Sequence, residues 1–304
     1  MRKQVRGSLC LLLATIIWGF AFIAQSVGMD KIGPFTFQAI RCALAVLFLI
    51  PCSFLMELRS CGFQKSAEKW KNPHLWKVGL ICGSALFVAA SLQQVGLVYT
   101  DAGKAGFLTA MYIVWVPVLG IFLGQKPPFT IVFSVAMAVV GLYLLSCMGV
   151  SQINKGDLLI MGCALAFAVQ ITCIDRFAGE LDGLRLTCVQ ALVVSVYSIP
   201  FLLLTETVEL SSVLACWKPL CFAGILSMGV AYSMQVIGQK SLEPTTASLI
   251  MSLESVFAVL GGWWLLGETM TVWETTGCIL VFAAVILSQL PVGLFQNKHK
   301  KNRS

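Results

Sequence analysis

Apolar runs of about 20 residues follow one another along nearly the whole chain, and only short polar breaks separate them. A helix needs about 20 apolar residues to cross the roughly 30 Å of hydrocarbon in a bilayer, so each run is a candidate transmembrane helix. The composition agrees, because 58 % of the residues are hydrophobic and only 12 % are charged, unlike the composition of a soluble domain. We therefore predict an all-α integral membrane protein with ten transmembrane helices, over residues 8–27, 34–56, 75–98, 104–124, 129–148, 157–177, 185–204, 217–237, 245–266 and 271–291.

The two halves of the chain resemble each other in the order and spacing of their residues. A shift of 142 residues places Gly238 on Gly96, and a shift of 149 residues places Gly156 on Gly7. Such internal similarity indicates a repeat. A repeat of five helices crosses the membrane an odd number of times, so we expect two inverted five-helix repeats. The first is predicted over residues 7–148 and the second over 156–291, followed by a basic cytoplasmic tail over 292–304.

Lysine and arginine positions predict the orientation, because short cytoplasmic loops carry an excess of positive charge. Of the 21 basic residues, 16 fall at helix ends on one side, four fall on the other side, and Arg41 lies inside a helix. We therefore expect a multi-pass protein of the inner (plasma) membrane with both termini in the cytoplasm. The same scattering over loop ends argues against a nucleic-acid partner, which requires a folded basic face.

Motifs for catalysis, metal binding or nucleotide binding are missing from the sequence. It contains no H-E-x-x-H, no G-x-S-x-G and no G-x-x-x-x-G-K-[ST] pattern, and its 12 cysteines include no C-x-x-C pair. We predict that the protein is not an enzyme and that it needs no metal or cofactor. Inverted repeats favour a transporter with a midplane site and alternating access. A membrane receptor or scaffold, and an integral membrane enzyme without a recognisable motif, remain the alternatives.

Four segments carry a resemblance to a known family: Ala14 to Phe22, Phe37 to Arg41, Ala247 to Glu254, and Leu265 to Glu268. As a set they resemble the drug/metabolite transporter (DMT) superfamily, specifically its bacterial EamA-type family, over residues 7 to 291. The resemblance implies a ten-helix exporter of small metabolites, often amino acids or related compounds, whose cavity is lined by helices one to four and six to nine. One departure is Gln125-Lys126, where the family's first half usually has a glutamate like Glu268. The sequence leaves open whether the protein acts as a monomer or a homodimer.

Two ionisable side chains lie deep inside predicted helices. Glu254 falls near the middle of 245–266, and Arg41 is the only basic residue well inside a helix. A charge at such depth is costly unless it faces a partner, water or a substrate. Helix rise predicts the two within about 5 Å of the same depth. Our hypothesis is that Arg41 receives an anionic group and Glu254 a cationic group or a proton; the alternative is a static ion pair. Burial disfavours the charged form of Glu254 and a nearby arginine favours it, so proton coupling stays open.

Uncharged residues complete the predicted substrate site. Trp18 lies about 15 Å into the first helix, where it either flanks a substrate or serves packing. Gln94 and Gln170 lie in helices expected to line the cavity, although glutamines between membrane helices also serve as interhelical hydrogen-bonding groups worth about 0.6 to 2 kcal/mol. Tyr112 is the repeat counterpart of Glu254, and Trp115 lies one turn deeper. The predicted substrate-binding residues are Trp18, Arg41, Gln94, Tyr112, Trp115, Gln170 and Glu254, with Glu254 as the proton-coupling candidate.

Overall fold

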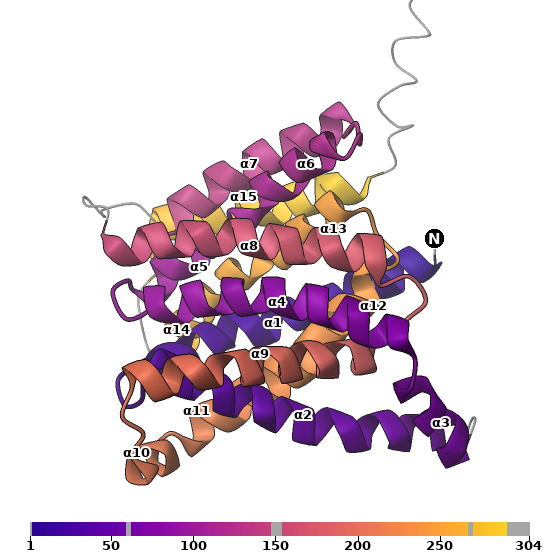
Figure 1. Ribbon diagram of the computed structural model, residues 1–304. Helices are drawn as coiled ribbons and strands as arrows, with labels where there is room; N and C mark the ends of the chain where they lie inside the picture. Colours follow the sequence, from indigo (N-terminus) through magenta and orange to yellow (C-terminus); the bar gives the residue numbers. More distant parts are fainter. Residues whose placement is uncertain (1, 59–61, 147–153, 267–269, 291–304) are drawn as a thin grey trace, which may run out of the picture.

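The computed structural model describes residues 2–58, 62–146, 154–266 and 270–290, and all regular secondary structure in these ranges is helical (Figure 1). The prediction of an all-helical fold is confirmed for this part of the chain. The first half contains α1 (Arg2–Met29), α2 (Pro34–Leu58), α3 (Gly62–Trp70), α4 (Pro73–Gly96), α5 (Ala102–Ala110), α6 (Tyr112–Phe122) and α7 (Phe129–Ser146). The second half contains α8 (Lys155–Phe177), α9 (Gly183–Thr205), α10 (Leu210–Ala215), α11 (Trp217–Cys221), the π-helix η1 (Phe222–Ala231), α12 (Tyr232–Gln239), α13 (Pro244–Met251), α14 (Leu253–Leu266) and α15 (Val272–Gln289).

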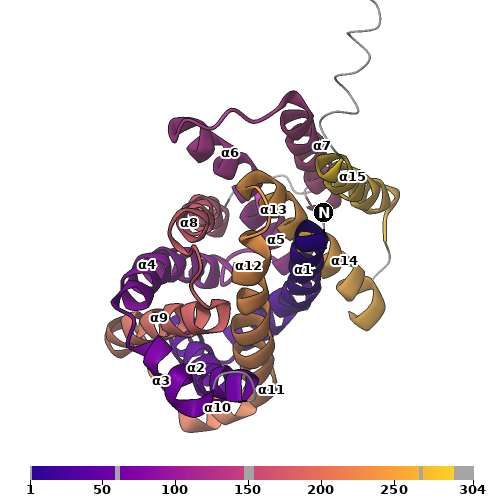
Figure 2. The same ribbon diagram turned by 90° about the vertical axis from the view of Figure 1, so that its right-hand side faces the viewer.

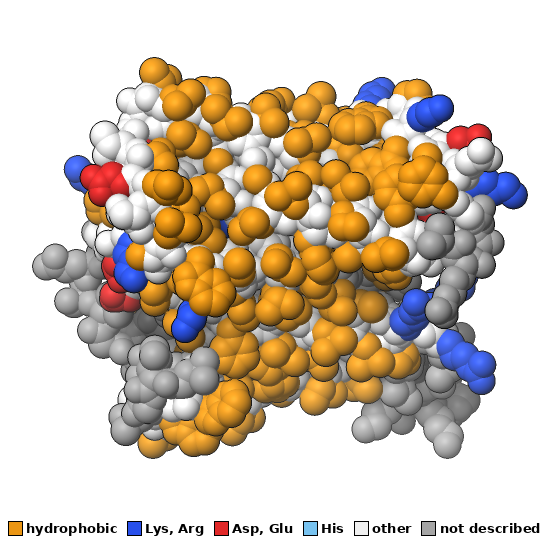
Figure 3. Space-filling view, turned by 90° about the horizontal axis from the view of Figure 1, so that it is seen from below, with side chains coloured by type: hydrophobic (Ala, Val, Ile, Leu, Met, Phe, Trp, Pro, Cys, Tyr) orange, Lys and Arg blue, Asp and Glu red, His pale blue; other side chains and the backbone are white. Residues whose placement is uncertain are grey.

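Nine stretches of the described residues are long and apolar enough to cross a membrane, and residues 129–145 form a further, shorter apolar helix. Several elements share one span: α5 continues into α6, α11 continues through η1 into α12, and α13 continues into α14. The helices run roughly side by side, and hydrophobic side chains form a broad belt between two ends where charged side chains gather (Figure 3). Such a belt is the surface that a bilayer requires, since lipid tails offer no partner for polar groups.

Helices far apart in the sequence pack against each other. α2 packs on α9, α7 on α15, α4 on both α8 and α9, and α1 on α12, η1 and α14. In the end-on view α7 and α15 lie together at one edge of the bundle, and α1 and α12 run closer to its middle (Figure 2). The functional elements described below therefore come from both halves of the chain.

Glycines allow the closest of these helix crossings. A Cβ atom on Gly7 of α1 would lie 2.8 Å from the carbonyl oxygen of Gly238 in α12, and one on Gly156 of α8 would lie 2.6 Å from the carbonyl oxygen of Gly96 in α4. Small residues let membrane helices approach until their backbones touch. The two crossings involve the same glycine positions that the sequence shifts of 142 and 149 residues place on each other.

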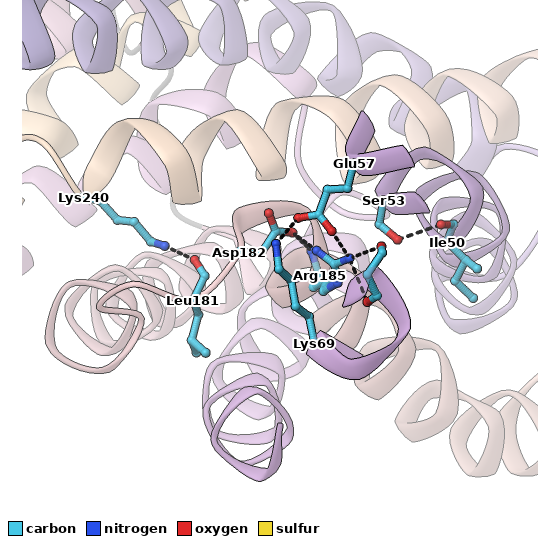
Figure 4. A network of polar contacts seen from close by, with 9 residues as sticks. Ile50, Ser53, Glu57, Lys69, Leu181, Asp182, Arg185 and Lys240 are labelled. Carbon is cyan, nitrogen blue, oxygen red and sulfur yellow. Dashed lines mark hydrogen bonds and ion pairs between the residues drawn. The ribbon is translucent and has the colours of Figure 1, made fainter. Parts of the chain in front are cut away.

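A polar network joins α2, α3 and α9 at one end of the bundle (Figure 4). Arg185, at the start of α9, is only 1 % exposed. Its Nη2 lies 2.7 Å from Oε2 of Glu57 near the end of α2, and 2.7 Å from Oγ of Ser66 in α3. Lys69 of α3 forms a second ion pair with Glu57. These contacts hold the amphipathic helix α3 against the ends of α2 and α9.

A related contact joins the same two helices at their other ends. Glu206, directly after α9, accepts hydrogen bonds from the backbone N–H groups of Phe35 and Thr36 at 2.8 Å, and from the Thr36 hydroxyl at 2.6 Å. It thereby satisfies N–H groups in the first turn of α2 and places a negative charge at the positive end of the helix dipole. A shift of 149 residues places Glu57 on Glu206. The α2–α9 pair is therefore held by a glutamate at each end.

Candidate functional site

A cavity lies where the spans of the two halves meet, and the space in it that a water-sized sphere can occupy is about 40 Å³. Ten of its lining residues form pairs that a shift of 142 or 149 residues relates, which places the cavity at the junction of the two halves. The pairs are Trp18 with Phe167, Phe22 with Ile171, Gln93 with Gln235, Thr109 with Met251, and Tyr112 with Glu254.

A carboxylate lies at one wall of this cavity, beside a break in its helix. The span formed by α13 and α14 is interrupted at Ser252, and the span formed by α5 and α6 is interrupted at Met111, one residue from the position that the shift of 142 residues relates to Ser252. The hydroxyl of Ser252 donates to the carbonyl oxygen of Leu249 at 2.7 Å, a local bond that competes with regular helix and bends it. Interrupted helices at membrane depth occur where the backbone lines a cavity.

Each break is followed within two residues by a polar side chain that lines the cavity. The hydroxyl of Tyr112 donates a hydrogen bond of 3.1 Å to Oε1 of Glu254. The two residues are 4 % and 6 % exposed, respectively. Within the part of the chain that the structure describes, Glu254 therefore has one side-chain donor, Tyr112, and it lines the cavity, where a second group can approach its carboxylate.

A guanidinium group lies at another wall. Arg41 of α2 is 5 % exposed, and its Nη1 donates to Oε1 of Gln25 in α1 at 2.6 Å. The amide of Gln25 is itself fixed, because its Nε2 donates to the carbonyl oxygen of Ala21 at 3.1 Å. Nε of Arg41 has no acceptor among the atoms of residues 2–58, 62–146, 154–266 and 270–290. A buried N–H group without a partner costs about 1–3 kcal/mol and calls for an explanation.

Arg41 and Glu254 do not form an ion pair with each other. None of the ion pairs in the described ranges joins them, so their charged atoms are more than 4.0 Å apart. Each is held instead by an uncharged side chain, Gln25 for the cation and Tyr112 for the carboxylate. The cavity thus has a basic and an acidic side chain at separate walls.

The π-helix η1 contributes the part of the wall that has no counterpart of the same kind in the first half. Ser227 lies in η1 and Tyr232 directly follows it, and both line the cavity. The ring of Tyr232 contacts Trp18 edge-on, with centroids 5.0 Å apart and planes at 65°. π-Helices are rare in proteins, and those that occur are often found at functional sites. The related residues in α4, Ala85 and Ala90, have no polar group in their side chains.

Four of the seven predicted site residues line this cavity together: Trp18, Arg41, Tyr112 and Glu254. The other three do not. Gln170 donates a hydrogen bond to Gln190 and accepts one from Gln235. It thus has the interhelical hydrogen-bonding role that was the alternative to substrate binding. Gln94 is fully buried with its Nε2 3.5 Å from the sulfur of Met29, and Trp115 is 38 % exposed.

Sequence reasoning missed several lining residues, namely Gln25, Gln93, Thr109, Tyr232 and Gln235. The repeat held a usable signal for two of them, because Gln93 and Gln235 are related by the shift of 142 residues. No pattern in the sequence singled out Gln25 as the partner of Arg41. Across the part of the chain that is described, no group of three or more His, Cys, Asp or Glu residues is placed to hold a metal ion. Glu268 lies outside the described residues.

Comparison with known proteins gives the family. The model of the EamA-like transporter family matches the chain twice, over residues 5–147 and 154–290. The chain belongs to this family. The resemblance to the DMT superfamily inferred from the sequence is thereby confirmed, and the protein is a multi-pass membrane transporter whose relatives are transporters, not enzymes. Membership implies a small-molecule substrate and a lipid surround.

Individual relatives of this EamA-family chain cover most of its length. A protein of Archaeoglobus fulgidus described as an uncharacterized transporter is 33 % identical, over 95 % of this chain and 88 % of the relative. The threonine/homoserine exporter RhtA of Salmonella typhimurium is 27 % identical, over 93 % of this chain and 91 % of the exporter. A crystal structure with a TM-score of 0.76 and 17 % identity covers 93 % of this chain and 96 % of that chain, which shows a shared fold.

Proposed function

We propose that this chain is a secondary transporter that exports small zwitterionic metabolites, such as amino acids, by alternating access. The observation that carries the proposal is the cavity with Arg41 and Glu254 at separate walls, each held by an uncharged neighbour and not by the other. An amino acid has one carboxylate and one ammonium group. In the proposal Arg41 receives the carboxylate, which its planar fork suits, and Glu254 receives the ammonium group.

The arrangement of the helices supports two inverted five-helix repeats, residues 7–148 and 156–291, as the moving parts. Repeat-related residues line the cavity in pairs, and repeat-related glycines form the α1–α12 and α4–α8 crossings. A site on the junction of two such repeats can open to either side when one repeat rocks against the other. We place the protein in the plasma membrane, with both termini and the basic tail 292–304 in the cytoplasm, from the distribution of lysine and arginine.

Proton exchange provides a driving force in this proposal. Glu254 carries either a proton or the ammonium group of the substrate, but not both. Substrate binding from the cytoplasm then releases a proton from Glu254, and a proton that enters from outside displaces the substrate, so export and proton entry are coupled. Tyr112 stabilises the ionised state with its hydrogen bond to Oε1. The threonine/homoserine exporters among the relatives support the direction and the class of substrate.

Flux in proteoliposomes tests the function. The intact protein, Arg41→Gln and Glu254→Gln are reconstituted in parallel and assayed with a labelled panel of amino acids, with and without an imposed pH gradient. We expect gradient-dependent flux of at least one amino acid in the intact protein and its loss in both variants. Normal flux in both variants would refute the proposed role of the two charges. Binding without flux would favour a receptor over a carrier.

A further inference from the structure

Two residues that line the same cavity each carry a buried N–H group without an acceptor. Nε of Arg41 and Nε1 of Trp18 lack a hydrogen-bond partner among the atoms of the described residues, and both residues line the cavity. Their side chains are buried, with 5 % and 9 % of each residue exposed. Buried donors in folded proteins nearly always have partners. Two orphaned donors that line one cavity therefore indicate an acceptor that the protein itself does not supply.

The surrounding contacts fix both donors in place. Gln25 holds Nη1 of Arg41 at 2.6 Å and is itself anchored on the carbonyl oxygen of Ala21, so the guanidinium cannot swing freely. The edge-on contact with Tyr232 orients the indole of Trp18. Close approach of α2 to η1 brings the arginine to the cavity, since a Cβ atom on Gly224 would lie 2.6 Å from the carbonyl oxygen of Arg41.

The corresponding positions of the second half lack this arrangement. A shift of 149 residues places Trp18 on Phe167, Gln25 on Ile174 and Arg41 on Gln190. Phe167 has a ring without an N–H group, and Ile174 has no polar side-chain atom. Donors for an anion are therefore gathered on the first half, whereas the carboxylate of Glu254 belongs to the second half. The two halves of the site differ in charge although their backbones are related.

We propose that Trp18 Nε1 and Arg41 Nε together bind the carboxylate of the transported compound, and that Gln25 is a positioning residue that aims the guanidinium at it. This inference deepens the proposed function and rests on it. A carboxylate has two oxygens and accepts from both donors at once, whereas a carboxamide has one oxygen and presents an NH₂ group to the second donor. The site therefore selects carboxylates over the matching amides.

Ligand binding to the purified protein tests this selection separately from transport. Thermal stabilisation is measured with a panel of amino acids and with the matching amino acid amides, and Kd values are determined for each acid that binds. The acids are expected to bind more tightly than their amides by about 10-fold or more, because a hydrogen bond to a charged group is stronger than one to a neutral group.

Two variants test the named residues. Trp18→Phe keeps a ring against Tyr232 and removes the N–H group, and it should weaken acid binding by about 10-fold with little effect on the amides. Gln25→Met keeps the length of the side chain and should reduce the preference for acids in the same direction. Trp115→Phe is the matched control, since Trp115 does not line the cavity and is partly exposed; its Kd values should equal those of the intact protein.

The outcomes separate the two proposals. If the intact protein binds and transports an amino acid but binds the matching amide equally well, the carboxylate site is overturned and the transporter proposal stands. The same conclusion follows if Trp18→Phe prefers acids over amides as strongly as the intact protein does. Neither binding nor flux of any acid in the intact protein would overturn the proposed function, and the carboxylate site with it. Size-exclusion profiles and melting temperatures without ligand show whether each variant is folded.

Discussion

Tyr112 and Glu254 occupy the same position in the two halves of the chain, and the hydroxyl of one donates a hydrogen bond to the carboxylate of the other at 3.1 Å. A residue can contact its own repeat counterpart only if both lie close to the axis that relates the repeats. In the proposed pair of inverted repeats, this axis would therefore pass beside the carboxylate. Such a position would suit the proposed alternating access, because a site near the axis is common to both access states.

The Tyr112–Glu254 hydrogen bond should contribute to transport. Tyr112→Phe removes the donor and keeps the ring, so a step that depends on ionised Glu254 should slow by about 10-fold or more, as expected for a hydrogen bond to a charged group worth about 1.5–3 kcal/mol. The measurement is the initial rate of flux under a pH gradient. Tyr143→Phe, at a half-exposed tyrosine of α7, is the control. Equal rates in all three proteins would mean that the hydrogen bond serves packing alone.

Coupling to protons should require a carboxylate at position 254. Glu254→Asp keeps an ionisable group and should retain part of the response to an imposed pH gradient, whereas Glu254→Gln should lose that response completely. Substrate accumulation is followed with the gradient in each direction and with it collapsed by an ionophore. A glutamine variant that still accumulates substrate in response to the gradient would assign the proton to another residue.

The glycine contacts between helices should be needed for stability. Gly156→Ala would place a methyl group 2.6 Å from the carbonyl oxygen of Gly96, and Gly7→Ala one 2.8 Å from that of Gly238. Overpacking of this kind typically costs about 1–3 kcal/mol. Each variant should therefore melt at a lower temperature in detergent. Gly103→Ala is the control, because no atom lies within 4 Å of the added methyl group, and its melting temperature should stay the same or rise.

The buried arginine at the end of the α2–α9 pair should make Glu57 important for stability. Glu57→Gln leaves Arg185, which is 1 % exposed, without the anion bound at 2.7 Å. Removal of one partner of a fully buried pair costs about 3–5 kcal/mol, and the partial exposure of Glu57 should reduce this to about 1–3 kcal/mol. The loss is measured as a lower melting temperature. Glu209→Gln is the control at an exposed glutamate whose side chain caps no helix. An equal melting temperature in the two variants would contradict the prediction.

The sequence was sufficient to predict the apolar helices and to place Arg41 and Glu254 deep inside two of them. Apolar runs set where each span begins and ends, since a bilayer accepts only segments whose backbone groups are satisfied internally. Depth follows from the rise of about 1.5 Å per residue. For this reason Arg41 and Glu254 could be placed deep inside predicted spans, and Tyr112 followed as the repeat counterpart of Glu254; all three line the cavity.

Rotation about the helix axis was decided only by tertiary packing. Gln93 and Gln94 are neighbours in α4, yet Gln93 lines the cavity and Gln94 is buried beside Met29. Successive residues of a helix point about 100° apart, so a one-residue choice depends on which neighbouring helices pack where. The amphipathic signal that identifies the inner face of a soluble helix is weak here, because both the lipid side and the packed side of a membrane helix are apolar.

The sequence also could not predict which side chains on different helices form hydrogen bonds or ion pairs with each other. Depth predicted that Arg41 and Glu254 lie near each other, but whether they pair depends on the directions of two side chains from different helices. The packing of α1 against α2 and η1 brings Gln25 within hydrogen-bonding distance of Arg41. The break at Ser252 precedes Glu254, which accepts a hydrogen bond from Tyr112. Sequence thus determined which polar and charged groups lie deep inside the apolar helices. The tertiary structure decided that the two charges stay apart, because only packing fixes how each helix is rotated and which side chain reaches it.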